Sequence, residues 1–364
     1  MQLSQAMKLS PDLFTPLTRT PWAGHRIAAL FKRNLLPQSQ LAAIGEAWEV
    51  SCDPSFPSQI LGSTSSLSEL IALQPEAMLS ADYVKENGPS CEILIKLLNA
   101  DDPLSVQVHP DDNDPALKPN ECGKPESWLV LDAEAHAGIY LGFSKAIERK
   151  KLELLLSEKG DLRPWLQFVP VKVGDYFEIQ PGVPHAIGPG TVLLEPQRVI
   201  AGRSGKTFRL WDWGRRYDDF GQIDLKSGKA RELHVDEALR LMRPEEQVGE
   251  DFVESLRRVA DIQWPIEGVE CHIYPANIWY QVIRLKITAK AALCLQIDRG
   301  FGTLVSLAGR YVCQGAGGNA QTFVMGEPGF LPHQSMPMII RAELDSDLIL
   351  VIPSGAEFRI QPLH

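Results

Sequence analysis

Residues 104–112 have the sequence LSVQVHPDD, and successive side chains in this stretch alternate in polarity. Neighbouring side chains of a strand point to opposite faces, so the two valines face one environment while Gln107 and His109 face the other. Positions two apart begin about 6.6 Å apart, a gap that Gln and His side chains can close onto one ion. The stretch therefore predicts a strand with one apolar face and one face suited to binding a ligand.

Two further potential metal ligands follow in the chain, Glu126 in GKPESWLVLDAE and His185 in GDYFEIQPGVPHAIGPG. In the second segment a strand is followed by a Pro-Gly turn that delivers the histidine into the interior of a barrel. Two imidazoles, one carboxylate and one amide oxygen suit Zn²⁺ and leave room for water or substrate. We expect one zinc ion per chain.

Each of these four residues also has an ordinary structural explanation. His109 beside a Pro-Asp turn can be a turn or capping residue, and Gln107 can form a cross-strand hydrogen bond. Glu126 can lie on the surface, and His185 can be a hydrogen-bonded core histidine. The combination of four donors at strand positions favours the metal site over these separate explanations.

A basic cluster follows the last of these residues. Residues 195–216 hold six Arg or Lys against two acids, a local charge of +4 on a chain whose net charge is −10. In the predicted strand TFRLWDW, Arg209 shares a face with Thr207, which indicates a fixed anion site rather than a solvated loop. Lys124 precedes Glu126 by two positions and can place an ammonium group beside the metal, although a lysine capping a turn is the alternative.

Short runs rich in Val, Ile, Phe and Tyr dominate the second half of the chain, and Gly and Pro separate them. This spacing is typical of antiparallel sandwiches and barrels. A helix is predicted at 144–160, with Ser144 as its N-cap and Gly160 just past its end. Shorter helices are predicted at 235–242 and 250–259.

The polar stretch RPEEQVGE at 243–250 marks a predicted domain boundary. We expect a metal-binding catalytic domain with a helical insertion over residues 1–245 and a β-rich domain over residues 246–364. The role of the second domain is not indicated by its sequence.

Composition excludes several classes of function. A content of 44% apolar and 23% charged residues is ordinary for a soluble globular protein. The net charge of −10 argues against nucleic acid and anionic membranes as partners. We find neither an apolar window of about 18 to 20 residues nor a signal peptide, and expect a cytoplasmic protein, a monomer or homodimer. The six cysteines lack CxxC spacing, which favours reduced, packed thiols.

Several of these segments together resemble the type I mannose-6-phosphate isomerases, metalloenzymes of the cupin superfamily. The resemblance rests on GEAWEVS (45–51), LIKLLNADDPLSVQVHPDD (94–112), GKPESWLVLDAE (123–134), VPVKVGDYFEIQPGVPHAIGPGTVLLEPQ (169–197), TFRLWDW (207–213) and RELH (231–234). It implies a mainly β fold, with a cupin jelly-roll barrel that carries helical insertions and a second, degenerate cupin-like β-sandwich. It also implies that the zinc ligands are Gln107, His109, Glu126 and His185.

The resemblance further implies that Lys124 and Arg209 lie at a sugar-phosphate substrate. The sequence departs from the family at Gly205, where bacterial relatives usually carry an acidic residue, and in a longer link between Glu195 and Arg209. Gln180 stands where the cupin turn has proline. These departures concern the geometry of substrate binding and not the metal site.

The implied reaction interconverts mannose 6-phosphate and fructose 6-phosphate by moving a proton from C2 to C1 through an enediolate. A divalent ion stabilises the negative charge of the enediolate as a Lewis acid. Arg209 is expected to anchor the phosphate or polarise the sugar oxygens, and Lys124 to stabilise the enediolate or transfer a proton. The sequence names no general base.

Two other classes of function stay open at this point. The chain can be a non-catalytic cupin that binds a metal and a sugar phosphate, which the glycine at position 205 favours. It can also be a cupin enzyme that acts on another sugar.

Overall fold

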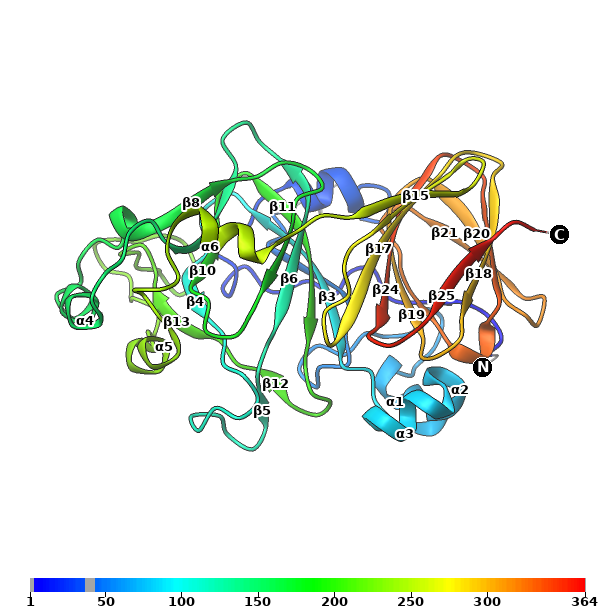
Figure 1. Ribbon diagram of the computed structural model, residues 1–364, viewed down its shortest axis with the longest axis horizontal. Helices are drawn as coiled ribbons and strands as arrows, with labels where there is room; N and C mark the ends of the chain where they lie inside the picture. Colours follow the sequence, from blue (N-terminus) through cyan, green and yellow to red (C-terminus); the bar gives the residue numbers. More distant parts are fainter. Residues whose placement is uncertain (1–2, 37–42, 364) are drawn as a thin grey trace.

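The computed structural model describes residues 3–36 and 43–363. Two β-rich units lie side by side along the long axis of the molecule (Figure 1), and each is built from two antiparallel sheets that face one another. The predicted mainly β fold, with a jelly-roll barrel and a second β-sandwich, is thereby confirmed. In the part of the chain that the structure describes, no helix has the length and apolar character that crossing a membrane requires.

The first unit contains a six-stranded and a five-stranded sheet. The six-stranded sheet has the order β14 (Arg257–Arg258), β9 (Tyr176–Ile179), β6 (Glu126–Ala133), β11 (Thr191–Arg198), β3 (Ile93–Ala100) and β2 (Glu46–Val50). The five-stranded sheet has the order β13 (Phe208–Trp211), β4 (Val106–Val108), β10 (His185–Ile187), β7 (Gly138–Phe143) and β8 (Leu166–Pro170). A short parallel pair joins β5 (Glu121–Cys122) to β12 (Ser204–Gly205).

The second unit contains a seven-stranded and a five-stranded sheet. The seven-stranded sheet has the order β1 (Met7–Lys8), β22 (Pro328–Leu331), β19 (Gly302–Ala308), β24 (Ser346–Pro353), β17 (Tyr280–Ile287), β16 (Val269–Ile273) and β15 (Asp261–Ile266). The other sheet has the order β21 (Ala320–Val324), β20 (Arg310–Gln314), β23 (Met338–Ala342), β18 (Ala292–Ile297) and β25 (Phe358–Gln361). Strand β1 therefore belongs to the unit formed by the opposite end of the chain.

Helices lie at the edges of these sheets. Three short helices, α1 (Leu67–Leu73), α2 (Pro75–Leu79) and α3 (Ala81–Asn87), lie together beside the junction of the two units (Figure 1). The sequence analysis did not predict them. The predicted helices at 235–242 and 250–259 are present as α5 (Val235–Leu241) and α6 (Gly249–Leu256). The described residues also form three short helical turns: η1 (Ile27–Lys32), η3 (Arg163–Trp165) and η4 (His333–Ser335).

The helix predicted at 144–160 is shorter than expected, and its predicted N-cap is wrong. Helix α4 spans Arg149–Ser157, with Glu148 at its N-cap position and no side-chain capping bond. The backbone N–H of Ser144 instead donates to the carbonyl of Trp165 at 2.8 Å, which ties this residue to the end of a neighbouring segment. Gly160 does lie just past the helix, where its N–H bonds back to the carbonyl of Leu155.

The six-stranded sheet forms a wall that both units share. On β6, Leu129 packs into a core with Val282 and Val351 of the second unit, whereas the adjacent Trp128 packs into the interior of the first unit. Strand β11 alternates in the same way, because Leu194 joins the shared core and Leu193 the interior of the first unit. One face of this sheet therefore packs against the second unit, and the other face lines the first unit's interior.

The chain leaves the first unit after β14. Arg257 forms an ion pair with Asp175 at 3.1 Å and Arg258 with Glu178 at 2.8 Å, which holds this short strand beside β9. These contacts also explain why α6 ends before the predicted limit at residue 259. The division into residues 1–245 and 246–364 stays a prediction.

Candidate metal centre

Three buried donor groups converge between the two sheets of the first unit. His185 is the first residue of β10, Glu126 is the first residue of β6, and His109 directly follows β4. The Nε2 atoms of His109 and His185 are 3.1 Å apart. Glu126 Oε2 lies 3.2 Å from the first of these nitrogens, and Glu126 Oε1 lies 3.5 Å from the second. Three segments that are distant in sequence thus place one donor atom each in a common volume.

Hydrogen bonds fix which nitrogen of each ring carries the proton. His109 Nδ1 lies 3.2 Å from the carbonyl of Lys206, and His185 Nδ1 lies 2.8 Å from the carbonyl of Val183. A carbonyl only accepts, so each Nδ1 donates and each Nε2 keeps a lone pair. Two lone pairs and a carboxylate therefore face one another in a buried space. This donor set fits a divalent cation, and its mixture of imidazole and carboxylate suits zinc.

The pKa shifts of the three groups agree with neutral imidazole rings and an ionised carboxylate. Burial and the charge of Lys124 lower the pKa of His109 to about 3, and burial lowers the pKa of His185. Burial works against ionisation of Glu126, yet the neighbouring charges of Lys124 and His109 hold the pKa of this carboxyl well below its usual range. At neutral pH the site thus presents neutral imidazoles and an ionised carboxylate, the forms that bind a metal.

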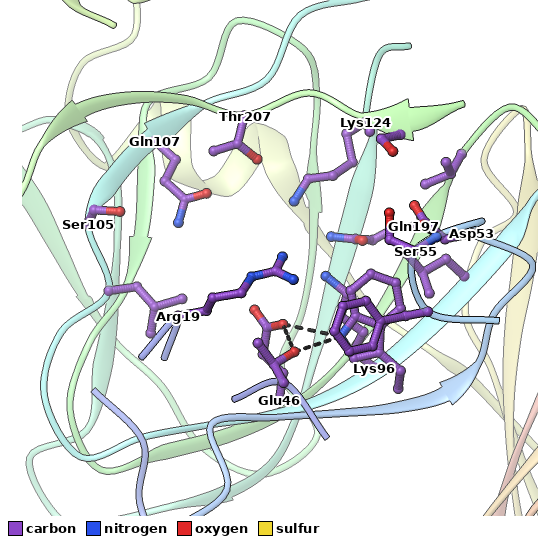
Figure 2. Close-up of a pocket in the computed structure, with 18 of the residues that line it drawn as sticks. Arg19, Glu46, Asp53, Ser55, Lys96, Ser105, Gln107, Lys124, Gln197 and Thr207 are labelled. Atoms are coloured by element: carbon purple, nitrogen blue, oxygen red, sulfur yellow. Dashed lines mark hydrogen bonds between the residues drawn. The ribbon is translucent and has the colours of Figure 1, made fainter. Parts of the chain in front are cut away.

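Gln107 lies on the wall of the same site. Strand β4 places it opposite His185 on one side and opposite Arg209 on the other. Lys124 Nζ lies 3.3 Å from Glu126 Oε2, so an ammonium group does stand beside the three donors. Figure 2 shows Gln107 and Lys124 from one side, and Glu46 from the other, pointing into one space.

A cavity of about 500 Å³ opens beside these residues. Both sheets of the first unit and the segment around residues 15–22 line it. Its charged lining residues are Arg19, Glu46, Asp53, Lys96, Lys124, Arg209 and Arg231. Basic side chains outnumber acidic ones, so the cavity suits an anionic small molecule.

Two arginines of the cavity have no carboxylate partner within the described residues. Arg209 donates from Nε to Ser105 Oγ at 3.2 Å and from Nη1 to the carbonyl of Glu232 at 2.8 Å. The guanidinium carbon of Arg19 lies over the ring face of Phe56, 5.3 Å from the ring centroid. Of the six basic residues at 195–216, Arg209 alone lines the cavity. Of the basic cluster at 195–216, the candidate anion site therefore includes Arg209 alone. It also includes Arg19, which lies outside that segment.

Glu46 is a cavity residue to which the sequence analysis gave no role. Its carboxylate accepts hydrogen bonds from Thr15 Oγ1 at 2.7 Å and from Trp48 Nε1 at 3.2 Å. Burial alone would raise the pKa of Glu46, but the charge of Lys96 and the bond from Thr15 outweigh it, and the pKa lies below its usual value. An available signal was the alternation within GEAWEVS, which places Glu46 and Trp48 on one face.

A second carboxylate, Glu195, is held against Glu126. Gln197 Nε2 donates to Glu126 Oε2 and to Glu195 Oε2, both at 2.7 Å. Trp128 Nε1 lies 3.1 Å from Glu126 Oε1 and 3.3 Å from Glu195 Oε1. Burial and the charge of Glu126 raise the pKa of Glu195 to about 8, so these two carboxyl groups differ in protonation at neutral pH.

Gly205 lines the cavity and packs against the stem of Lys124. A β-carbon at this position would lie 2.8 Å from Lys124 Cγ, closer than real contacts allow. Lys124 can therefore occupy its present position only because residue 205 has no side chain, acidic or otherwise.

Comparisons with known proteins agree with the architecture. Residues 17–134 match the family described as phosphomannose isomerase type I, catalytic domain. YvyI of Bacillus subtilis, a protein assigned to the mannose-6-phosphate isomerases, is 30% identical over 236 residues, which cover 64% of this chain and 68% of YvyI. The crystal structure of mannose 6-phosphate isomerase from Bacillus subtilis superposes with a TM-score of 0.74 at 22% identity, covering 95% of this chain and 99% of that one. A zinc-bound mannose 6-phosphate isomerase superposes with a TM-score of 0.68 at 15% identity, covering 96% and 99% of the two chains.

Proposed function

Because the chain belongs to the type I phosphomannose isomerases, we propose that it interconverts mannose 6-phosphate and fructose 6-phosphate with one zinc ion per chain. Gln107, His109, Glu126 and His185 would hold the ion. Zinc, when bound, supplies a Lewis acid that polarises the sugar oxygens at the reacting carbons. The family relationship supports the reaction, and the solved zinc-bound relative supports the choice of metal.

The observation that carries this proposal is the convergence of His109, Glu126 and His185. Their donor atoms all lie within 4.8 Å of one another, and all three side chains are buried. A buried cluster of two imidazole lone pairs and an ionised carboxylate is repulsive without a cation. The cavity beside it has room for a hexose phosphate and carries the basic residues that an anion requires.

The phosphate is proposed to bind between Arg209 and Arg19. Both guanidinium groups line the cavity and have no competing carboxylate partner in the described part of the chain. Two hydrogen bonds also fix the guanidinium group of Arg209. Its remaining N–H groups can donate to phosphate oxygens. Anchoring the phosphate remote from C1 and C2 orients the reacting carbons.

Lys124 is proposed to stabilise the negative charge that develops on the sugar oxygens. Burial would lower its pKa, but the charges of Glu126 and Glu195 raise it above the usual value, so Lys124 is an ammonium at neutral pH. A fixed ammonium in a buried site stabilises the enediolate without reorganising during the reaction. Lys124 therefore acts as an electrostatic stabiliser in this proposal and not as a base.

Glu46 is our proposal for the general base that transfers the proton between C2 and C1. It is ionised at neutral pH, lines the cavity, and is held in place by Thr15 and Trp48. A glutamate base also serves triosephosphate isomerase, which catalyses the same type of aldose–ketose exchange. Glu195 is the less suitable candidate because its raised pKa leaves it protonated at neutral pH.

Turnover of mannose 6-phosphate by the zinc-loaded protein, coupled to detection of fructose 6-phosphate, tests the proposal. We expect turnover that a chelator abolishes and added zinc restores, with one zinc per chain by elemental analysis. Saturable binding of the sugar phosphate without turnover would identify a sensor instead. Turnover that survives complete removal of the metal would overturn the assigned role of the zinc site.

A further inference from the structure

We propose that Tyr280, a residue of the second unit, is a positioning residue for the metal centre of the first. The proposal rests on the function proposed above and extends it by giving the second unit a part in the site. Tyr280 is the first residue of β17 and is 1% exposed. Its hydroxyl donates to the carbonyl of Pro196 at 2.7 Å and lies 3.0 Å from Ser127 Oγ, which can donate to it in turn.

The two partners of Tyr280 belong to the two central strands of the shared wall. Strands β6 and β11 are paired so that Glu126 lies opposite Gln197 and Leu129 lies opposite Leu194. Ser127 and Pro196 lie between these pairs, on the face that packs against the second unit. The tyrosine hydroxyl thus bridges both strands from outside the first unit.

The opposite face of the same stretch carries the polar groups of the site. One position along from Ser127 are Glu126 and Trp128, and one position along from Pro196 are Glu195 and Gln197. Two side-chain hydrogen bonds cross between the strands there, from Gln197 to Glu126 at 2.7 Å and from Trp128 to Glu195 at 3.3 Å. A small slip of β6 against β11 would change both contacts and move the carboxylate of Glu126.

The pairing of these strands has a weak point at the position that Tyr280 contacts. Pro196 has no N–H to donate, and it sits in β11, which has a neighbouring strand on each side. An interior strand rarely contains proline for this reason. Pro196 cannot donate a backbone hydrogen bond to the sheet, and its carbonyl accepts a hydrogen bond from the hydroxyl of Tyr280 in the second unit.

The variant Tyr280→Phe removes this hydroxyl and keeps the ring that fills the shared core. We expect zinc affinity, measured by competition with a chelator, to fall about tenfold, the scale seen when partners around a metal ligand are removed. We expect kcat to fall by a similar factor, while KM for mannose 6-phosphate stays within about twofold because the phosphate anchors are untouched.

The matched control is Tyr311→Phe. Tyr311 is also fully buried, and its hydroxyl lies 2.7 Å from Ser306 Oγ, but both residues belong to the second unit and lie away from the metal centre. This control should lower the melting temperature of the metal-free protein about as much as Tyr280→Phe and leave zinc affinity and kcat unchanged. Ser127→Ala should weaken zinc binding in the same direction, and its effect should not add to that of Tyr280→Phe.

The outcomes separate this inference from the proposed function. If Tyr280→Phe lowers stability like the control but binds zinc and turns over substrate like the wild type, Tyr280 is merely a structural residue and the inference is wrong. A wild-type chain that binds zinc without isomerase turnover overturns the proposed function, while the zinc affinities still decide the role of Tyr280. A wild-type chain that binds no zinc overturns both.

Discussion

The two units of this protein use similar pairs of facing sheets to enclose opposite kinds of interior. The first unit buries charged and polar side chains at its centre, including His109, Glu126, His185, Glu195 and Gln197. The second unit fills the same kind of space with apolar side chains, among them Ile283, Leu285, Leu293, Leu295, Leu304 and Leu350. The same kind of fold thus encloses a polar centre in one unit and a predominantly apolar core in the other, where buried polar side chains such as Thr303 and Ser306 are hydrogen-bonded.

Two histidines that follow a proline, one in each unit, illustrate this contrast. His185 follows Val-Pro and His333 follows Leu-Pro; a turn separates His185 from strand β9, whereas only Pro332 separates His333 from strand β22. His185 then begins β10 and faces Glu126, whereas His333 begins the helical turn η4 and its buried Nδ1 has no hydrogen-bond partner among residues 3–36 and 43–363. The facing strands, and not the turn, therefore determine whether the histidine meets other metal ligands.

We expect the largest loss of activity when a histidine of the metal centre, His109, is replaced, and none when His333 of the second unit is replaced. His109→Ala removes one of the converging donors of the first unit, so we expect zinc content near zero and a loss of at least about 10³-fold in kcat/KM, because the metal supplies several kcal/mol to the transition state. Elemental analysis and the coupled assay measure both quantities. The matched variant His333→Ala should retain zinc and activity. Full activity of His109→Ala would contradict the assigned metal site.

The second largest expected effect is a loss of kcat without a change in zinc affinity, caused by a substitution in the first unit. Glu46→Gln keeps the size of the side chain but cannot accept a proton, so we expect kcat to fall by about 10²-fold or more, as is typical when a general base is removed. Zinc affinity should not change, since Glu46 is not one of the three converging donors. Wild-type kcat in this variant would eliminate Glu46 as the base.

A third variant tests the apolar interior of the second unit. Leu350 is fully buried there, and Leu350→Ala should lower the free energy of unfolding by about 2 to 5 kcal/mol, the usual result of leaving a cavity in a packed core. Denaturant unfolding measures the change. The folded protein should still bind zinc with wild-type affinity. A large loss of zinc affinity with little loss of stability would show that this core is coupled to the site.

The smallest effect concerns two glycines, one in each unit. Gly205→Ala places a β-carbon against Lys124 Cγ, so we expect the ammonium group to shift and kcat to fall about tenfold or less. Gly302→Ala in β19 is the control, because its β-carbon would lie 3.0 Å from Leu350 Cδ1. That change should alter the melting temperature and leave kcat intact. Equal kinetics in both variants would remove Gly205 as a determinant of the lysine's position.

Local patterns in the sequence predicted the strands on which the proposed metal ligands lie. The alternation in residues 104–112 gives Gln107 and His109 their shared direction, and the turn before His185 gives that residue its place at the start of a strand. Both are short-range properties of the chain. The prediction of Ser144 as an N-cap was wrong because its backbone bonds to Trp165, a contact that local capping rules do not include.

Residues whose roles depend on distant partners were not predictable. Glu46 and Glu49 occupy one strand, yet Glu46 faces the cavity near Lys96, and Glu49 lies 2.7 Å from Lys32 in a buried ion pair. The alternation within GEAWEVS separates the two faces of the strand, but it does not indicate which face meets Lys96 and which meets Lys32. The same holds for Tyr280, because its contact with Pro196 spans 84 positions and joins two units.

The pairing of β1 with β22 bears on how the chain is made. Met7 lies opposite Phe330, and Lys8 Nζ is bonded to Glu327 across 319 positions of sequence. During synthesis Lys8 therefore leaves the ribosome 319 residues before Glu327, and β1 has no partner strand while the first unit is being made. Final assembly of the seven-stranded sheet is for that reason a late step of folding, and it requires β1 to remain unpaired until β22 has been synthesised.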